Sequence, residues 1–344
     1  MDHLNENEEQ NPLQENVDTS NDIKFTNRID LSELQEAVEK IKSELSKVIV
    51  GQKNMVDMLI TALLASGHIL IEGVPGVAKT ITAKLLAKAL TVDFSRIQFT
   101  PDIVPSDILG TSIFDLKKSE FEFKKGPIFS NMVLIDEINR APAKTQAALF
   151  EVMEERQITI DGNRYPLSPP FMVLATQNPV EQEGTYRLPE AQLDRFLFKI
   201  DIDYPTLEDE IEIINREHLL KEAKKIDQVE SFLTQQQIIK YQSVVNDILV
   251  EPQLLKYIAE IIVNTRNNQF LYLGASPRAS IAILKASKAY AAMNGRDFVT
   301  PEDIKQVAIP VLQHRIIVTP EREMEGVSSK QIIAQIIQSI EIPR

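Results

Sequence analysis

The segment GVPGVAKT, from Gly73 to Thr80, has the residue types and the spacing of a loop that binds phosphate. In the general motif, G-x-x-x-x-G-K-S/T, backbone amides surround the phosphates, the lysine reaches the β- and γ-phosphates, and the hydroxyl ligates Mg²⁺. Lys79 and Thr80 stand at the expected distance from Gly73, but Ala78 replaces the second glycine. Because alanine is the smallest side chain after glycine, we expect the loop to keep its close approach to phosphate if this residue has a negative φ. A structural Gly-Pro turn before a core helix is the alternative.

Two adjacent carboxylates, Asp136 and Glu137, end the apolar run in NMVLIDE. The first carboxylate suits Mg²⁺, held through a water or through Thr80, and the second suits polarisation of an attacking water. Beside a phosphate loop, these are the groups that phosphoryl transfer to water requires. A solvated strand end is the alternative, and the presence of the loop argues against it.

Three further polar residues could serve the same reaction. Asn178, in ATQNP, could orient the water or contact the γ-phosphate, although an Asn-Pro turn would also explain it. Arg195, in LPEAQLDRF, could be an arginine finger acting within the chain or on a neighbour, and a surface ion pair is the alternative. Arg278, in GASPRAS, begins a helical pattern and could touch the phosphates from a lid or simply be solvated. Arg140 is another cation close to the carboxylate pair, and the sequence does not rank it against Arg278.

The central part of the chain alternates short apolar runs with helical patterns. Continuous hydrophobicity is expected of strands buried on both faces, and strand-helix alternation indicates a parallel sheet with crossover helices. We therefore predict an α/β fold, with a five-stranded parallel sheet that carries the phosphate loop, in residues 31–205. Ligands bind beyond the carboxyl ends of such strands, so the polar residues after each run should face one site. The five runs are HILIEG, RIQFT, NMVLIDE, PFMVLATQN and LFKIDIDYP.

The two ends of the chain differ from this central part. Residues 1–30 are rich in Asn, Glu, Gln and Asp and have too few apolar residues to offset the entropy of ordering, so we expect a disordered acidic tail. In residues 206–344 the strand signal disappears, and we expect a smaller all-helical lid domain. Its helices should start where a polar residue precedes proline. These starts are Glu251-Pro252, Ser276-Pro277, Thr300-Pro301 and Thr319-Pro320.

Composition narrows the classes of function. The formal net charge of −13 over 344 residues disfavours general attraction to nucleic acid or to an anionic membrane. The absence of cysteine excludes disulfides and thiolate metal sites, and the four histidines are too far apart in sequence to form a ligand pair. Neither a run of about 20 apolar residues nor the order of a signal peptide is present. We therefore expect a cytoplasmic protein without direct membrane insertion.

In order and spacing these motifs resemble the AAA+ ATPases, and among them the MoxR family, over about residues 31–341. GVPGVAKT resembles the family's phosphate loop, which accepts the alanine, and VLIDEINRAPAKTQAALFEVMEE resembles its Mg²⁺ and general-base segment. ATQNP, LPEAQLDRF and GASPRA resemble the first sensor, the finger segment and the second sensor, and VIVGQ resembles the box near the adenine. The resemblance implies ATP contacts from Val50, Gly51, Gln52, Gly73, Val74, Pro75, Gly76, Val77, Ala78, Lys79, Thr80 and Ile81.

The resemblance also implies an ATP-hydrolysing, chaperone-like enzyme that remodels or matures client proteins. The implied catalytic residues are Glu137, Asn178, Arg195 and Arg278, and the implied Mg²⁺ residues are Thr80 and Asp136. A homohexameric ring is implied in which Arg195 completes the site of the neighbouring subunit. A partner with a von Willebrand factor A domain is implied too, with a client that receives a metal or a cofactor. Two other functions stay open, a nucleotide-dependent assembly switch and a nucleic-acid motor.

Two segments within the α/β part have hairpin patterns. TSIFDLKKSEFEFKKGPIF alternates apolar and charged residues around Ser119-Glu120, and ITIDGNRYPL contains Asp161-Gly162. They resemble the helix-2 insert and the pre-sensor hairpin of this AAA+ branch, which in related rings line the pore or contact clients. The lysine pairs of the first segment could bind nucleic acid, but the interleaved Glu120 and Glu122 favour a solvated hairpin.

Overall fold

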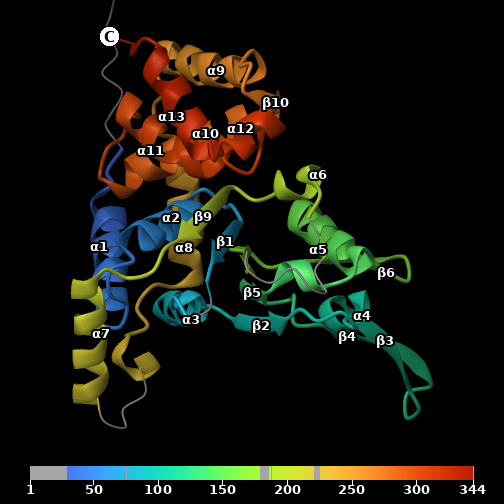
Figure 1. Ribbon diagram of the computed structural model, residues 1–344. Coiled ribbons are helices and arrows are strands. Elements are labelled where there is room, and N and C mark those ends of the chain that lie inside the picture. The colour runs from blue at the N-terminus through green and yellow to red at the C-terminus, as the bar shows by residue number, and fades with distance from the viewer. Residues whose placement is uncertain (1–28, 75, 179–185, 187, 221–224, 344) are drawn as a thin grey trace, which may run out of the picture.

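Residues 29–74, 76–178, 186, 188–220 and 225–343 are described by the structure, a computed structural model (Figure 1). The expected disordered tail, apart from residues 29 and 30, and Pro75 of the phosphate loop lie outside these ranges. Five strands form one sheet in which every neighbouring pair is parallel, so the predicted sheet is confirmed. In spatial order they are β2 (Phe94–Gln98), β5 (Met132–Asp136), β8 (Met172–Gln177), β1 (Ile69–Gly73) and β9 (Phe198–Ile202).

Alternate residues of the central strands enter two separate hydrophobic cores. In β5, Leu134 belongs to one core, whereas Val133 and Ile135 belong to the other. Successive side chains of a strand point to opposite faces, so two covered faces require the continuous apolar runs seen in the sequence. The helices of the α/β part that share the first core are α1 (Ser32–Ser46), α2 (Lys53–Leu64) and α3 (Lys79–Ala89), and those that share the second are α4 (Pro105–Leu109) and α5 (Ala143–Glu155).

Both predicted hairpins are present. The first pairs β3 (Gly110–Asp115) with β4 (Glu120–Lys125), and the second pairs β6 (Gln157–Ile160) with β7 (Asn163–Pro166). In the second hairpin, Asp161 and Gly162 both have positive φ, as a two-residue turn of this type requires. The hairpins contact each other through the rings of Phe123 and Tyr165, whose centroids are 4.4 Å apart. Figure 1 shows the first hairpin extending away from the rest of the molecule.

Most of the chain after β9 is helical, which agrees with the predicted lid. A proline occupies the first turn of α9 (Pro252–Arg266), α10 (Pro277–Met293), α11 (Pro301–Leu312) and α12 (Pro320–Met324), directly after the predicted polar residue, so the four predicted helix starts are confirmed. The expectation of a wholly helical lid is incomplete, because β10 (Leu271–Leu273) and β11 (Ile317–Val318) pair antiparallel. Strands this short cannot show a periodic pattern in the sequence. None of the helices in the described part of the chain combines the length and the apolar character needed to cross a membrane.

The remaining elements are mostly the helices of this C-terminal part. They are η1 (Ile138–Arg140), α6 (Glu190–Leu193), α7 (Leu207–Leu220), η2 (Lys225–Gln228), α8 (Gln235–Asn246), α9 (Pro252–Arg266), α10 (Pro277–Met293), α11 (Pro301–Leu312), α12 (Pro320–Met324) and α13 (Ser329–Ser339).

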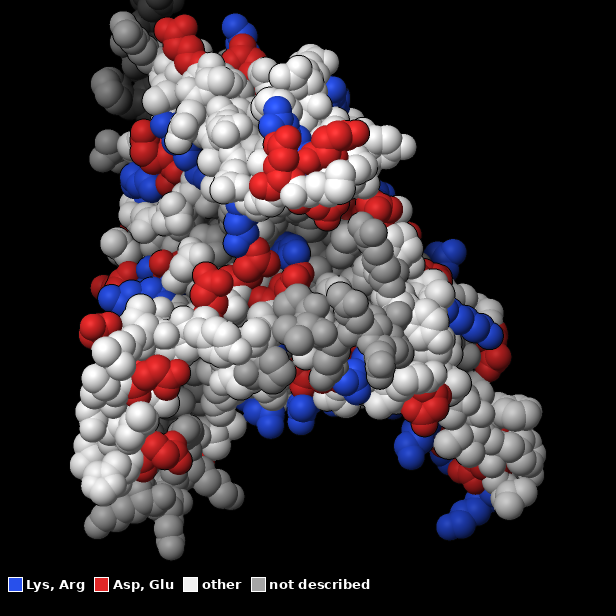
Figure 2. Space-filling model, in the orientation of Figure 1, with Lys and Arg blue, Asp and Glu red and all other residues white. Residues whose placement is uncertain are grey.

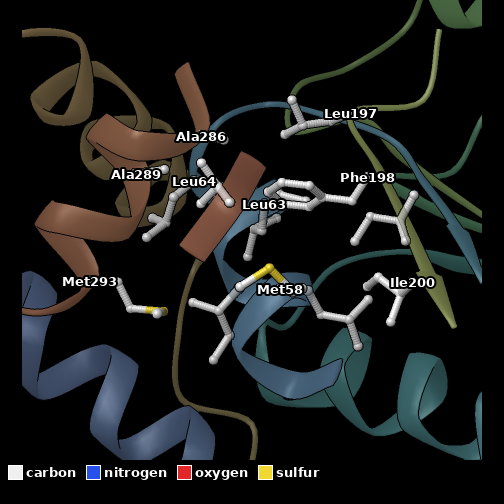
Figure 3. Close-up of a cluster of buried hydrophobic side chains, with 14 of the residues drawn as sticks. Met58, Leu63, Leu64, Leu197, Phe198, Ile200, Ala286, Ala289 and Met293 are labelled. Atoms are coloured by element: carbon white, nitrogen blue, oxygen red, sulfur yellow. The ribbon is translucent and has the colours of Figure 1, made fainter. Parts of the chain in front are cut away.

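The lid packs on the α/β part through a continuous apolar core (Figure 3). Side chains from α2, from β9 and the residue before it, and from α10 meet there: Met58, Leu63, Leu64, Leu197, Phe198, Ile200, Ala286, Ala289 and Met293. The small alanine side chains of α10 allow its backbone to approach its neighbours closely. Since the two parts share this core, the domain boundary at residue 205 stays a prediction.

Two buried histidines make stability depend on pH. His68 accepts a hydrogen bond from the Val173 amide at Nδ1 (3.0 Å) and has Nε2 3.1 Å from the Met153 carbonyl, an arrangement that suits the neutral ring. Burial lowers the pKa of His68 to about 4, and burial also lowers the pKa of His314 well below its ordinary value.

We therefore expect the free energy of unfolding to decrease as the pH falls from about 6.5 to about 4, because the unfolded histidines bind protons that the folded ones exclude. Each group contributes a slope of up to about 1.4 kcal/mol per pH unit in this window and none above it. Urea unfolding across this pH range measures the effect. His68→Gln should lower the free energy of unfolding at pH 7 and make it depend less steeply on pH, whereas replacement of the exposed His218 should do neither. A profile of unchanged steepness in His68→Gln would contradict the assignment.

Candidate nucleotide-binding site

The predicted phosphate loop joins the end of β1 to the start of α3, which is the context that an anion-binding loop needs. A side chain at Gly73 would come within 2.9 Å of the Ile202 carbonyl, so this glycine is required by the packing of β1 against β9. Gly76 has a φ of +90°, and open space lies where its side chain would be. The loop therefore turns through a glycine conformation and presents its backbone to open space.

Ala78 departs from expectation. Its φ is +60°, in the left-handed region, so the negative φ that was set as the condition for close approach to phosphate is not met. A residue other than glycine pays about 1–2 kcal/mol for this conformation. The first turn of α3 holds it in place, since the amide and the hydroxyl of Thr82 both donate to the Ala78 carbonyl, at 3.0 and 2.9 Å. The loop thus keeps a backbone conformation that favours glycine, with an alanine at that position.

Lys79 is half-buried at the first position of α3. Its ammonium donates to the Gly73 carbonyl at 2.6 Å, so it folds over the loop. Burial lowers the pKa of Lys79, and the negative charges of three carboxylates, Asp136, Glu137 and Glu72, oppose this shift. The lysine and the carboxylate pair, which are far apart in the sequence, are thus neighbours at one edge of the sheet, as predicted.

Asp136 is the last residue of β5 and is 7% exposed. One of its oxygens accepts from Arg96 Nε at 2.6 Å, and the other accepts from the Thr176 hydroxyl at 3.2 Å. Arg96 lies on β2 and Thr176 on β8, so both neighbouring strands hold this carboxylate. The aspartate is therefore fixed in orientation from both sides.

Glu137 has a φ of +58°, which is rare for a residue other than glycine. Its amide donates to the Thr176 hydroxyl at 3.0 Å, and its carboxylate accepts from the Gln98 side chain at 2.9 Å. Arg140 forms an ion pair with the same carboxylate at 3.0 Å. Strained backbone held by several contacts is common where a side chain must be aimed at a reacting group.

Sequence reasoning missed three residues that hold the carboxylate pair: Arg96, Gln98 and Thr176. Arg96 and Gln98 are two positions apart on β2 and therefore point to the same face. A signal was available, because polar residues on either side of Ile97 interrupt a strand expected to be apolar. Which carboxylates they contact depends on the register of β2 against β5, in which Gln98 pairs with Asp136, and no pattern in the sequence fixes that register.

The donor set fits Mg²⁺. In the described residues no group of three or more histidines and carboxylates could hold a metal by itself. Magnesium in nucleotide sites needs only one or two protein oxygens, because phosphates and waters supply the remaining ligands. Thr80, which follows Lys79 on α3, and Asp136 can supply those oxygens. Asn178 follows β8, next to β5 in the sheet, and is buried.

Arg195 and Arg278 both contact one carboxylate, Glu154, which is not part of the predicted site. Arg195 Nε is 2.8 Å from one oxygen of Glu154, and Arg278 Nη2 donates to the other oxygen at 2.8 Å. Arg195 Nη1 also donates to the Ala191 carbonyl at 3.0 Å. Within the described part of the chain neither arginine contacts the loop or the carboxylate pair.

This pair of arginines lies at the opposite edge of the sheet, beside the amino ends of β1 and β9. Both line a pocket of about 240 Å³ whose other walls include His68, which precedes β1, and Leu197, which precedes β9. Glu154 stands near the end of α5, a crossover helix about 20 Å long that begins shortly after Glu137. The phosphate loop is at the carboxyl ends of the strands, so one chain carries the two halves of the predicted site on different edges.

The predicted adenine box lies between α1 and α2. Gly51 has a φ of +75°, and a side chain there would collide with Asp209 of α7. Val50, Gly51 and Gln52 line a pocket of about 490 Å³ together with residues of α1, α2 and Arg216 of α7. No residue of the phosphate loop is part of that lining, so contact of the box with ATP stays a prediction.

Two family models match the chain in the order of its two parts. Residues 68–198 match the ATPase family associated with various cellular activities (AAA), and residues 263–336 match an AAA lid domain. The first range contains the phosphate loop, the carboxylate pair, Asn178 and Arg195. The second contains Arg278.

Similar proteins extend over most of the chain. The Bacillus subtilis protein YeaC is 44% identical over 311 residues, which cover 90% of this chain and 96% of YeaC. Chaperone MoxR1 of Mycobacterium tuberculosis is 42% identical over 317 residues, covering 89% of this chain and 82% of MoxR1. A crystal structure of a protein from Cytophaga hutchinsonii superimposes with a TM-score of 0.84 at 45% identity and covers 91% of this chain and 97% of that one. With the predicted fold and the loop geometry, these similarities show that the chain belongs to the MoxR family of AAA+ ATPases.

Proposed function

We propose that this protein hydrolyses ATP in a ring of identical subunits and uses the reaction to remodel or mature client proteins. One observation carries the proposal: the phosphate loop with its carboxylate pair lies at one edge of the sheet, and the paired arginines lie at the other. A site divided in this way is completed when the arginine edge of one subunit meets the loop edge of the next. Contacts of this head-to-tail kind generate closed rings.

Within one subunit, the loop amides and Lys79 would bind the β- and γ-phosphates. Glu137 would accept the proton of the attacking water, and Asn178 would orient that water. Thr80 and Asp136 would hold Mg²⁺, which would supply positive charge to the phosphates. Gln98 and Thr176 would keep Glu137 in place before the substrate arrives, and Arg96 would do the same for Asp136.

From the next subunit, Arg195 and Arg278 would stabilise charge on the γ-phosphate. The sequence left open whether Arg278 acts within its own chain. Its contact with Glu154, beside Arg195, supports action on the neighbour for both arginines. A homohexamer, as the family resemblance implies, remains our proposal for the ring.

The client and the partner rest on the resemblance alone. We propose a partner with a von Willebrand factor A domain and a client that receives a metal or a cofactor, in line with one relative named a chaperone. The expected cytoplasmic location also stays a prediction.

The first hairpin gives no support to a nucleic-acid motor. Lys118 is 3.1 Å from Glu122 and 3.9 Å from Asp115, so acids of the same hairpin neutralise it. Figure 2 shows basic and acidic side chains mixed with uncharged ones at this hairpin, on the lower right. Absence of nucleic-acid binding therefore stays our expectation.

The test is the ATPase rate per subunit, measured against protein concentration in the presence of Mg²⁺. We expect the rate to rise with concentration and then reach a plateau, because isolated subunits lack the arginines of a neighbour. Lys79→Ala, which loses the phosphate-binding ammonium, should be inactive at every concentration and serves as the control. A constant, measurable rate from a protein that sizing shows to be monomeric would contradict the divided site.

A further inference from the structure

Glu154 is the only carboxylate that both arginines contact in the described part of the chain, and each arginine uses a different oxygen. Oε2 pairs with Arg195 Nε and Oε1 accepts from Arg278 Nη2, both at 2.8 Å. Arg195 precedes β9 and Arg278 is in the first turn of α10, so the carboxylate joins the finger segment to the lid. Neither the sequence pattern nor the family comparison assigned a role to Glu154.

The contacts with Glu154 leave donors of both arginines available. A guanidinium has five N–H donors on three nitrogens. In the described residues, Arg195 Nε forms the ion pair with Glu154 and Nη1 donates to Ala191, whereas its Nη2 makes no hydrogen bond. Arg278 uses Nη2, and its Nε and Nη1 make none. Both arginines can therefore bind an anion while they remain bound to Glu154.

The surroundings explain why a carboxylate is needed at this position. The pocket lining includes three further cations, Arg156, Lys285 and Arg315, and one further carboxylate, Asp194. Asp194 is already engaged, because Arg315 Nε donates to it at 2.6 Å. Without Glu154, two guanidinium groups would lie side by side among other cations and would repel each other.

We propose that Glu154 is a positioning residue that holds Arg195 and Arg278 as one pair, so that both reach the γ-phosphate of the nucleotide bound to the next subunit. This inference rests on the proposed function, because the pair has a task only where subunits share a site. Glu154 itself does not touch the nucleotide. Its effect comes from orienting two cations in advance, which lowers the reorganisation required during the reaction.

The experiment compares Glu154→Ala and Glu154→Gln with the parent. Loss of orientation should lower kcat for ATP hydrolysis roughly ten- to a hundredfold in Glu154→Ala, since small misplacements of catalytic groups have effects of this size. KM for ATP should change little, because the loop that binds ATP is at the other edge of the sheet. Glu154→Gln keeps the length and one acceptor oxygen, so its kcat should lie between those of Glu154→Ala and the parent.

A second readout does not depend on catalysis. In the parent, a non-hydrolysable ATP analogue should favour assembly at lower protein concentration, because the arginines bind the analogue across the interface. This shift should shrink in Glu154→Ala, while assembly without nucleotide and the melting temperature stay close to those of the parent. Glu155→Ala is the matched control, since Glu155 is the next residue on α5, carries the same charge and is exposed.

Two results would overturn the proposal in different ways. A fully active Glu154→Ala with an unchanged assembly shift, beside an inactive Arg195→Ala, would overturn the role of Glu154 alone. An Arg195→Ala variant as active as the parent would overturn the proposed function and this inference with it.

Discussion

Replacement of Glu137 by glutamine is expected to lower the ATPase rate by at least about a hundredfold while ATP still binds. Glutamine keeps the length of the side chain and an oxygen that can accept from Gln98, but it cannot take a proton from water. Lys79 and the loop amides, which bind the phosphates, are unchanged. The substitution therefore removes the base and leaves the binding groups in place.

The measurement pairs the steady-state ATPase rate with equilibrium binding of ATP to the same preparation. Glu155→Gln makes the same chemical change at an exposed position and should behave as the parent in both assays. A Glu137→Gln variant that binds ATP and hydrolyses it at the parent rate would show that another group accepts the proton.

Much of the fold could be predicted from the sequence because its signals are local. Five apolar runs overlap the five parallel strands, and proline after a polar residue begins four lid helices. These features follow from side-chain burial and from the fixed φ of proline, which act over a few residues. The pair β10 and β11 could not be predicted, because two or three residues carry no detectable period.

The site was predictable in part for the same reason. Lys79, Asp136 and Glu137 meet because the carboxyl ends of parallel strands share an edge. The alternation of strands and helices in the sequence implies that the strands are parallel. The φ of Ala78 was not predictable, since alanine generally avoids the left-handed region and only the surrounding loop imposes it here. The joint contact of Arg195 and Arg278 with Glu154 depends on how the lid docks on α5, a long-range packing that no motif encodes.

Replacement of Arg195 by alanine is expected to lower the ATPase rate about a thousandfold or more, the usual loss for an arginine finger. ATP binding should persist, because the contacts of Arg195 in the described chain are Glu154 and Ala191, far from the loop. The important expectation concerns mixtures. Glu137→Gln subunits keep the arginine edge and Arg195→Ala subunits keep the loop edge, so two inactive variants contain between them one complete site.

An equimolar mixture of these two variants should recover activity, since about a quarter of randomly formed head-to-tail interfaces join an intact loop edge to an intact arginine edge. The control mixture replaces Arg195→Ala with the double variant Glu137→Gln/Arg195→Ala, in which no interface is complete, and should stay inactive. Sizing must show that the variants assemble together. If they do and the first mixture stays inactive, Arg195 serves its own chain. The placement of the loop and the arginines at opposite edges would then not reflect a site shared between subunits. Recovery in the first mixture alone requires that the arginine and the carboxylate act across a subunit boundary, since each variant by itself lacks one of them.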